Sequence, residues 1–285
     1  AIYSQTGNTL NLEGCQFTDS FGDALYVAGR CAVDINDCRF VGNEREDRSL
    51  TDYQGYSGTT FSYTLVNDQY RPTQRIFEGG AIYLGPNCTR VNVTNSAFHG
   101  NYADEQGGAV RTLTDATFKD CVFGGNEAGN RGGAFDAYYE NGYPTDLVVL
   151  DLDFERCSFV NNRAYGGLDG LGGGMYINDV NVTLTDCDFI NNKAKNGGAL
   201  MAVTSTATLN RTLVHGNRAV GASGINTVIS AGYGSIANYV SSLPAVTQLP
   251  DLSTGIDTGG ALFFADTNVL LADSQLTENK AEGVN

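Results

Sequence analysis

The feature that most constrains the fold is a short word that recurs along the whole chain. One copy, residues 186–199, reads DCDFINNKAKNGGA, and related words return at intervals such as the 25 residues from Phe98 to Phe123. Self-similarity at a fixed period is the signature of repeat architectures. Eight copies can be aligned on one position, which is occupied by Cys15, Cys38, Ser96, Cys121, Cys157, Cys187, Thr212 and Ser274.

Each copy contains three stretches with the pattern of a short strand. Positions five and three residues before the aligned position are apolar in all eight copies, and polar residues flank them, which predicts a strand of period two. Two residues after the aligned position, a second strand carries Phe17, Phe40, Phe98, Phe123, Phe159, Phe189, Val214 and Leu276. A third strand begins near the Gly-Gly-Ala words with Ile2, Leu25, Ile82, Val110, Phe135, Tyr176, Leu200 and Leu262. Three short strands per repeat predict an all-β parallel β-helix, a solenoid of about eight coils.

A column of asparagines follows the second strand of each copy. Ser20 takes this place in the first copy, and the other seven carry Asn43, Asn101, Asn126, Asn162, Asn192, Asn217 and Asn279. Asn tolerates the dihedral angles of tight turns, and stacked side-chain amides can hydrogen-bond one another along a column of strands. The sequence therefore predicts an Asn ladder along one row of corners.

The repeats leave one β-helix domain, residues 1–285, with two large insertions at 44–78 and 219–258. Both insertions leave after the Asn column and return at a Gly-Gly-Ala word, so we expect them on one side of the stack. Solenoids often bind partners through insertions on one face, and the first insertion is rich in Tyr, which is enriched where surfaces meet. We expect lateral contacts between rods, or with another partner; the alternative is that both segments cover the flank of the solenoid.

Composition argues against several kinds of partner. The formal charge is −15 and no basic run exists to neutralise phosphates, which argues against nucleic acid and anionic membranes. No stretch approaches the roughly 20 consecutive apolar residues that a membrane span needs. The Gly-Gly-Ala words precede strands and no helix, so they do not predict a phosphate-binding loop. We expect no cofactor.

Catalysis has to be considered because pectin lyases and polygalacturonases are also parallel β-helices. Asp115 and Asp151 share an outward column in neighbouring coils, and Asp153 lies two residues along the same face. Carboxylates so placed could hold a hard cation or divide acid and base roles in glycoside hydrolysis. Solvated strands routinely carry Asp, however, and the adjacent columns offer only Arg90 as a cationic partner.

The two histidines give no support to a catalytic site. His99 and His215 share a column but lie many coils apart, so they cannot form a dyad. Neither has the spacing of a metal ligand. The sequence thus favours a protein that is not an enzyme and that binds no metal.

Seven cysteines suggest cross-links between coils. Cys31 and Cys88 each lie seven residues after the Ala of their strand, in neighbouring coils, and a separation of about 4.8 Å between stacked positions suits a disulfide. Cys15 and Cys38 are neighbours in the aligned column, as are three further cysteines. The alternative is an inward ladder of reduced thiols that act as small apolar groups. An odd count leaves at least one thiol unpaired within the chain.

The repeat words also resemble those of a known family. GGAI at 79–82 and FVNN at 159–162 resemble the repeats of the chlamydial polymorphic outer-membrane proteins, which are right-handed β-helical surface proteins and adhesins. This resemblance implies a right-handed β-helix and a secreted, extracellular or cell-surface location.

Asn-x-Ser/Thr sequons point to a different source, a secreted eukaryotic glycoprotein of a protist or alga. Those sequons predict N-linked glycans at Asn87, Asn92, Asn181 and Asn210. The alternative is that the sequons arise by chance in an Asn- and Thr-rich repeat.

The two ends of the sequence fit one another. If Ala1 followed Asn285, the Asn279 column would lie seven residues before the strand Ala, the same spacing as from Asn192 to Ala199. Open strand edges invite another chain, and a head-to-tail contact that does not close generates a filament. We therefore expect continuation between copies, or within a longer chain, through Ala1, Ile2, Tyr3, Asn279, Lys280, Val284 and Asn285. The alternative is a fragment of a longer, non-periodic β-helix.

These observations rank three functions. The first is a non-enzymatic extracellular structural protein, a rod-like unit that stacks head-to-tail into a filament or surface fibre. A cell-surface adhesin is the second, and a pectin-lyase-like or polygalacturonase-like enzyme is the third.

Overall fold

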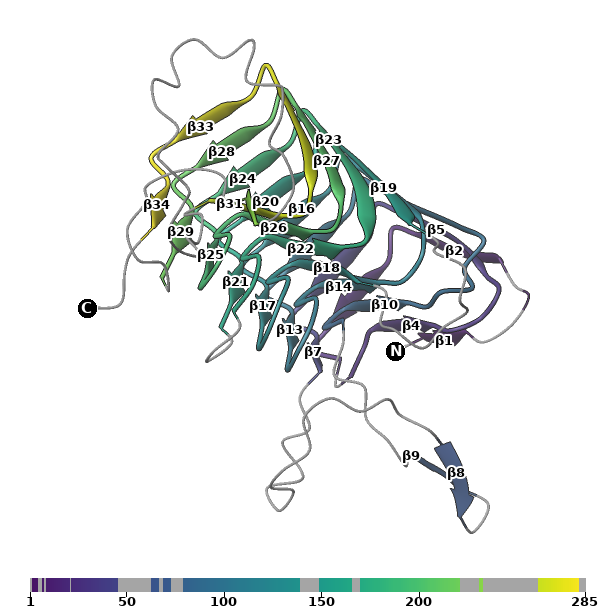
Figure 1. Ribbon diagram of the computed structural model, residues 1–285. Helices are drawn as coiled ribbons and strands as arrows, with labels where there is room; N and C mark the ends of the chain where they lie inside the picture. Colours follow the sequence, from purple (N-terminus) through teal and green to yellow (C-terminus); the bar gives the residue numbers. More distant parts are fainter. Residues whose placement is uncertain are drawn as a thin grey trace.

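The computed structural model describes residues 2–4, 7, 9–20, 22–45, 63–66, 69–72, 79–138, 149–165, 170–220, 231–232 and 261–281. Within these ranges the regular structure consists of β-strands. The strands form four parallel sheets of nine, eight, eight and seven strands and one antiparallel hairpin (Figure 1). Each turn of the chain adds one strand to each parallel sheet, except that the described part of the first coil adds none to the seven-stranded sheet and β30 adds a ninth strand to the largest.

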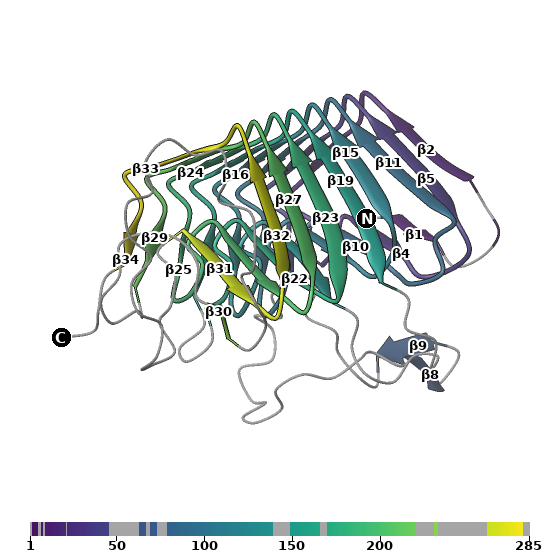
Figure 2. The ribbon, with the colours of Figure 1, turned by 45° about the horizontal axis from the view of Figure 1, so that its top comes forward.

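We number the four sheets in the order in which a coil passes through them. Sheet 1 contains β1 (Ile2–Ser4), β4 (Leu25–Val27), β10 (Ile82–Leu84), β14 (Val110–Thr112), β18 (Phe135–Tyr138), β22 (Met175–Asn178), β26 (Leu200–Val203), β31 (Leu262–Ala265) and β30 (Ala231–Gly232). Sheet 2 contains β2 (Thr9–Glu13), β5 (Ala32–Asn36), β11 (Arg90–Thr94), β15 (Ala116–Lys119), β19 (Leu150–Glu155), β23 (Val180–Thr185), β27 (Thr206–Asn210) and β32 (Asn268–Ala272). The strands of sheet 2 lie side by side in Figure 2.

The other two sheets complete the coil. Sheet 3 contains β3 (Gln16–Thr18), β6 (Arg39–Val41), β12 (Ala97–His99), β16 (Val122–Gly124), β20 (Ser158–Val160), β24 (Asp188–Ile190), β28 (Leu213–His215) and β33 (Gln275–Thr277). Sheet 4 contains β7 (Glu44–Arg45), β13 (Tyr102–Ala103), β17 (Glu127–Ala128), β21 (Arg163–Ala164), β25 (Lys193–Ala194), β29 (Arg218–Ala219) and β34 (Lys280–Ala281).

The right-handed parallel β-helix predicted from the repeats is confirmed. The count of three strands per coil omitted sheet 4, whose strands are only two residues long. Two residues cannot display a period of two, although a signal was available in the Ala that follows the ladder Asn by two residues in six coils, at Ala103, Ala128, Ala164, Ala194, Ala219 and Ala281. One position in sheet 1 is also corrected, because Met175, not Tyr176, pairs with Phe135 and Leu200. The word before it reads Gly-Gly-Gly, and Gly174 takes the place of the usual Ala.

A column of phenylalanine rings fills the core beneath sheet 3. Neighbouring rings stack with centroids 4.6–5.0 Å apart, from Phe17 through Phe40, Phe98, Phe123 and Phe159 to Phe189. From Phe40 onward these rings are fully buried. Each buried ring contributes about 1.5–3 kcal/mol relative to an exposed one. The predicted inward column is therefore a main source of stability.

The asparagines form one continuous ladder from the first rung at Asn43 to the last at Asn279. Each Nδ2 donates to the Oδ1 of the Asn in the next coil at 2.9–3.0 Å. The same Oδ1 accepts the backbone N–H of the preceding Asn at 2.8–3.0 Å. Nδ2 also donates to the carbonyl of an inward residue of the preceding coil, as Asn162 does to Phe123 at 2.9 Å. The ladder thus satisfies polar groups of both backbone and side chains inside the core.

The corners between sheets 2 and 3 carry charges of alternating sign. The residues here have positive φ, and the sign alternates along Asp120, Arg156, Asp186, Arg211 and Asp273. Arg156 donates to both carboxylate oxygens of Asp120 at 2.6 and 2.9 Å, and Arg211 does the same to Asp186 at 2.6 and 2.7 Å. These hydrogen bonds lower the pKa of Asp120 and of Asp186. Two pairs of adjacent coils are therefore joined by bidentate ion pairs at this corner as well as by their core.

Both insertions leave from sheet 4 and return to sheet 1. The first begins only after β7, which belongs to the solenoid, and contains the hairpin of β8 (Tyr63–Val66) and β9 (Gln69–Pro72) (Figure 1). The second begins after β29 and contributes β30 to the edge of sheet 1. The remainder of 44–78 and 219–258, on which the predicted lateral contacts depend, lies outside the described residues.

Candidate functional site

The three carboxylates weighed as a catalytic group lie on the exposed face of sheet 2. The backbone N–H of Asp151 donates to Asp115 Oδ1 at 2.9 Å, and Asn181 Nδ2 donates to Asp151 Oδ1 at 2.9 Å. Asp153 stands opposite Thr117 and Thr183 in the strand register. The prediction that Asp115 and Asp151 lie next to one another is confirmed. Their oxygens, however, serve as acceptors in bonds between neighbouring strands.

The cationic partner suggested for this group is engaged elsewhere. Arg90 forms an ion pair with Asp34 on β5, on the side of β11 away from β15 and β19. That contact, with the hydrogen bond from Asn92, lowers the pKa of Asp34, and the Asn92 bond has the larger effect. Across the described ranges, His, Cys, Asp and Glu form no group of three or more that could hold a metal ion.

The histidines are separated by three strands of sheet 3. His99 lies on β12 and His215 on β28, with β16, β20 and β24 between them. His215 Nδ1 is 2.9 Å from Thr277 Oγ1, and its Nε2 is 3.8 Å from Glu278. The structure does not bring the two rings together.

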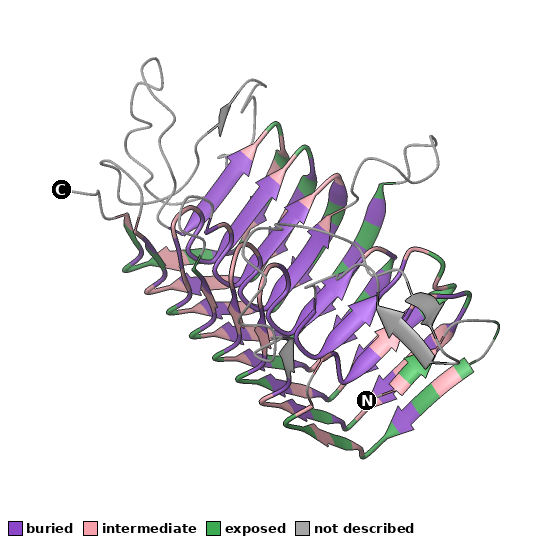
Figure 3. Cartoon of the chain, turned by 90° about the horizontal axis from the view of Figure 1, so that it is seen from below, coloured by how far each residue is buried: buried purple, intermediate pink, exposed green. Residues whose placement is uncertain are grey.

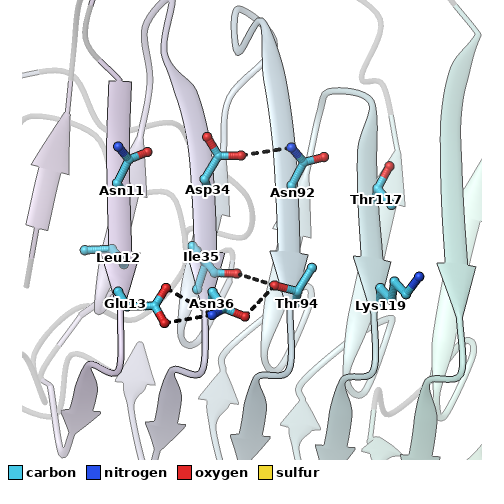
Figure 4. Close-up of a pocket in the computed structure, with 10 residues that line it drawn as sticks. All are labelled: Asn11, Leu12, Glu13, Asp34, Ile35, Asn36, Asn92, Thr94, Thr117 and Lys119. Carbon is cyan, nitrogen blue, oxygen red and sulfur yellow. Dashed lines mark hydrogen bonds between the residues drawn. The ribbon is translucent and has the colours of Figure 1, made fainter.

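A shallow hollow lies on sheet 2 across its first four strands. Figure 4 shows its polar lining, in which cross-strand bonds connect one side chain to the next. Asn36 Nδ2 donates to the Glu13 carboxylate at 2.8 and 3.0 Å, and Thr94 Oγ1 donates to Asn36 Oδ1 at 2.7 Å. Asn92 Nδ2 donates to Asp34 Oδ1 at 2.9 Å. This face is an ordered polar surface, built by the same stacking that builds the core.

The sequons lie outside the core. Asn87 is exposed in a turn, Asn181 is exposed on β23, and Asn92 and Asn210 are half-buried. The amides of Asn92 and Asn181 hydrogen-bond to carboxylates of the preceding coil. N-linked glycosylation stays a prediction.

All seven cysteines are described, and all are free thiols in the structure. The register also corrects the expected stacking, because the N–H of Thr89, not of Cys88, donates to the Cys31 carbonyl at 2.8 Å. Burial, with Cys31 nearby, raises the pKa of the Cys88 thiol to about 12. In the aligned column, the backbone N–H of Cys15 donates to Cys38 Sγ at 3.4 Å. The Cys31–Cys88 and Cys15–Cys38 disulfides stay predictions.

The residues expected at an end-to-end contact are described in part. Ile2 and Tyr3 lie on β1, Asn279 is the last rung of the ladder, and Lys280 lies on β34. Ala1, Val284 and Asn285 lie outside the described residues. Head-to-tail stacking stays a prediction.

The structure reveals a buried charged cluster that the sequence reasoning missed. On the outward side of sheet 1, the Asp136 carboxylate forms an ion pair with Arg111 and accepts a hydrogen bond from Arg131 Nε at 3.1 Å. Arg111 is 1% exposed and Asp136 is 0% exposed. Arg111 Nη2 also donates to the Tyr138 carbonyl at 2.9 Å, and the Arg131 guanidinium lies 4.5 Å from the Tyr138 ring centre. The cluster combines one carboxylate and two cations with an aromatic ring.

This cluster belongs to an outward row on sheet 1 that is mostly buried (Figure 3). The row runs in strand register through Tyr3, Tyr26, Tyr83, Arg111, Asp136, Tyr176, Met201 and Phe263. The first three rings stack with centroids 5.1 and 4.7 Å apart. A signal was available, because strands buried on both faces read as continuous apolar runs, as in Ile82–Leu84.

The part of the chain that the structure describes contains no helix with the length and apolar character needed to cross a membrane.

Comparison with known proteins agrees with this architecture. Residues 1–219 match the family described as "Right handed beta helix region". The chain is 32% identical over 186 residues to the probable autotransporter YfaL of Escherichia coli (strain K12), an alignment that covers 60% of this chain and 14% of that protein. The chlamydial family and the eukaryotic source expected from the sequence stay predictions. Because the family match covers most of its length, the chain belongs to the right-handed β-helix family.

Proposed function

We propose that this chain is a non-enzymatic shaft of an extracellular surface protein. The observation that carries the proposal is the unbroken register of the solenoid, in which the Asn ladder runs from Asn43 to Asn279 without a missing rung. A stack in which each coil bonds only to its neighbours through core, ladder and corner ion pairs behaves as a stiff one-dimensional element. Such an element suits a structural role.

The similarity to an autotransporter supports placing this shaft at the cell surface. The relative is named a probable autotransporter, and the GGAI and FVNN words resemble repeats of surface proteins. Neither the family description nor that name refers to an enzymatic activity. The carboxylates of sheet 2 act in cross-strand bonds, which fits a surface without catalytic machinery.

Head-to-tail stacking belongs to the same proposal. In the outermost strands of sheet 2, the inward residues Leu10 and Val269 are only partly buried, whereas their counterparts in inner coils are buried. Another coil placed against either strand, from the same polypeptide or from another copy, would bury these side chains and satisfy the strand edge.

A surface adhesin is the second candidate. The feature that favours it is the position of the two insertions, both of which leave sheet 4 and return to sheet 1. Insertions gathered on one side of a solenoid are often its binding face.

Surface exposure can be measured on intact cells that make the native protein. We expect an antibody against the purified chain to label unpermeabilised cells, and external protease to remove the label while a cytoplasmic marker stays intact. Labelling that requires permeabilisation would contradict the surface assignment.

A further inference from the structure

A row of basic side chains runs along the C-terminal half of sheet 4. Arg163, Lys193, Arg218 and Lys280 occupy the same outward position in four successive strands, β21, β25, β29 and β34. Lys195 lies two residues beyond Lys193. We call these five residues the basic stripe; they account for five of the 17 Lys and Arg residues in a chain of net charge −15. Figure 1 shows the four strands side by side along one edge of the solenoid.

The arrangement of the stripe differs from that of other cations in the described coils. On sheet 2 and at the corners, a cation faces a carboxylate, as in Lys119–Glu155 at 3.2 Å and Arg211–Asp186 at 2.6 Å. In the stripe, Arg163 pairs in register with Lys193, Lys193 with Arg218, and Arg218 with Lys280, while the other register neighbour of Arg163 is Glu127 at the end of the row. Neighbouring strands are about 4.8 Å apart, and like charges directly opposite one another are destabilising. The stripe therefore places cations in four successive coils, unlike the ion-paired cations of sheet 2 and the corners.

Several features leave the stripe reachable from solvent. Arg218 and Lys280 are exposed, and Arg163 and Lys193 are half-buried. Tyr165, 41% exposed, lies beside the row with its ring centre 3.9 Å from the Arg163 guanidinium. Lys193, Lys195 and Arg218 also have interactions within the molecule, so a ligand would compete with these contacts for the cations.

We propose that the basic stripe binds an acidic polysaccharide whose chain runs along the solenoid axis. One cation per coil gives a line of positive charge that matches a linear polymer with regularly spaced carboxylates. The Tyr165 ring supplies an apolar face of the kind on which sugar rings stack. This inference rests on the proposed function, because a surface shaft would meet such polymers outside the cell.

The geometry favours a polysaccharide over nucleic acid. Duplex DNA presents one charge per roughly 1.7 Å of axis, which is far denser than one cation per coil. Single-stranded nucleic acids are held by several aromatic rings that stack successive bases, whereas Tyr165 is the one exposed aromatic that the described part of the stripe provides. The acidic remainder of the molecule would also repel a densely charged polymer more strongly.

The test measures binding of alginate oligosaccharides, a polyuronate, to the purified full chain at low ionic strength. The stripe variant is Arg218→Gln with Lys280→Gln, both at exposed positions. The matched control is Arg90→Gln with Lys119→Gln, which removes the same charge from exposed cations of sheet 2. We expect the wild type and the control to bind alginate with a salt-dependent affinity. The stripe variant should bind about tenfold more weakly, with a shallower salt dependence. Neutral dextran should not bind.

Three outcomes would overturn the inference. The first is no binding of alginate, the second is equal weakening in both variants, and the third is single-stranded DNA bound as tightly as alginate. Circular dichroism on both variants establishes that they are folded. Failure of this test while intact cells still label with antibody would remove the ligand and leave the surface function standing. Alginate binding by a protein that is absent from the cell surface would support the ligand and contradict the surface function.

Discussion

At the scale of single residues, the inward asparagines are the most demanding positions. Asn162 Oδ1 accepts two hydrogen bonds from Asn126, and its Nδ2 donates to Asn192 Oδ1 and to the Phe123 carbonyl. Asn162→Ala would leave several buried partners unsatisfied, each costing about 1–3 kcal/mol. We expect the free energy of unfolding to fall by about 3–5 kcal/mol in urea titrations.

The matched control is Asn11→Ala, because Asn11 lies exposed on β2. A surface change of this kind should stay within about 0.5 kcal/mol of the wild type. Equal losses for the two variants would show that the ladder does not stabilise the fold.

The corner ion pairs predict how stability depends on acidity. The Arg211 guanidinium lowers the folded-state pKa of Asp186 below its ordinary value of 3.8, and Arg156 does the same for Asp120. A carboxyl with a lowered folded pKa adds stability that is fully present above the unfolded pKa and is lost as pH falls through the folded pKa. Thermal midpoints of the wild type should therefore decline below about pH 4.

The double variant Arg156→Gln with Arg211→Gln tests this origin of the acid dependence. It should be less stable near neutral pH and should lose less on acidification below about pH 4, because fewer depressed pKa values remain. High salt should reduce the difference, since exposed pairs are screened. Identical acid profiles would contradict the assignment.

The oxidation state of the cysteines in the native protein can be measured directly. Oxidation would link Cys31 to Cys88 in the neighbouring coil, whereas the structure holds both as thiols. Peptide mapping of the native protein without reduction decides between them. A Cys31–Cys88 peptide supports the cross-link, and free Cys31 contradicts it.

At the scale of elements, stability depends on position in the stack. Phe159 on β20 stacks between Phe123 and Phe189 with centroids 4.7 and 4.6 Å away, whereas Phe17 on β3 has one stacked neighbour and is half-buried. Phe159→Ala should lower the free energy of unfolding by about 3–5 kcal/mol, and Phe17→Ala by clearly less. A larger loss at Phe17 would contradict the ordering of the core.

Sequence alone predicted three of the four strands of each coil and the Asn ladder. The inward columns of sheets 1, 2 and 3 and the Asn rungs recur in nearly every coil, so their alignment predicted both the strands and the ladder. The two-residue strands of sheet 4, such as Lys193–Ala194, each have one inward residue and so lack the alternation that identified the other strands, although that inward residue is Ala in six coils. Met175 was misplaced by one residue because Gly174 stands where other copies have Ala, and Thr89 replaces Cys88 opposite Cys31 because the arc before β11 is one residue longer than the arc before β5.

The residues of the candidate site could also be predicted only in part. The alignment of the repeats predicts that Asp115 and Asp151 lie next to one another. The hydrogen bonds that their oxygens accept depend on neighbours such as Asn181, which the alignment does not identify. The Arg111–Asp136 pair is not predictable from the repeat, because an outward position on a strand is usually solvated. Burial on both faces of sheet 1 is a tertiary property, which only the continuous apolar runs hinted at.

At the scale of the whole molecule, the described coils act as one stack. Sheet 2 joins all eight coils from β2 to β32, and sheet 3 joins them from β3 to β33. Because contacts connect only successive coils, stiffness comes from repetition, and binding features such as the basic stripe are lines along the axis.

Cryo-electron microscopy of the native, full-length protein would show whether this chain forms a continuous β-helical shaft. We expect a straight rod in which strand layers repeat about every 4.7–4.9 Å along the axis and in which all eight coils fit without a break. A compact particle, or coils interrupted by a separately folded domain between β2 and β32, would show that the chain is not such a shaft.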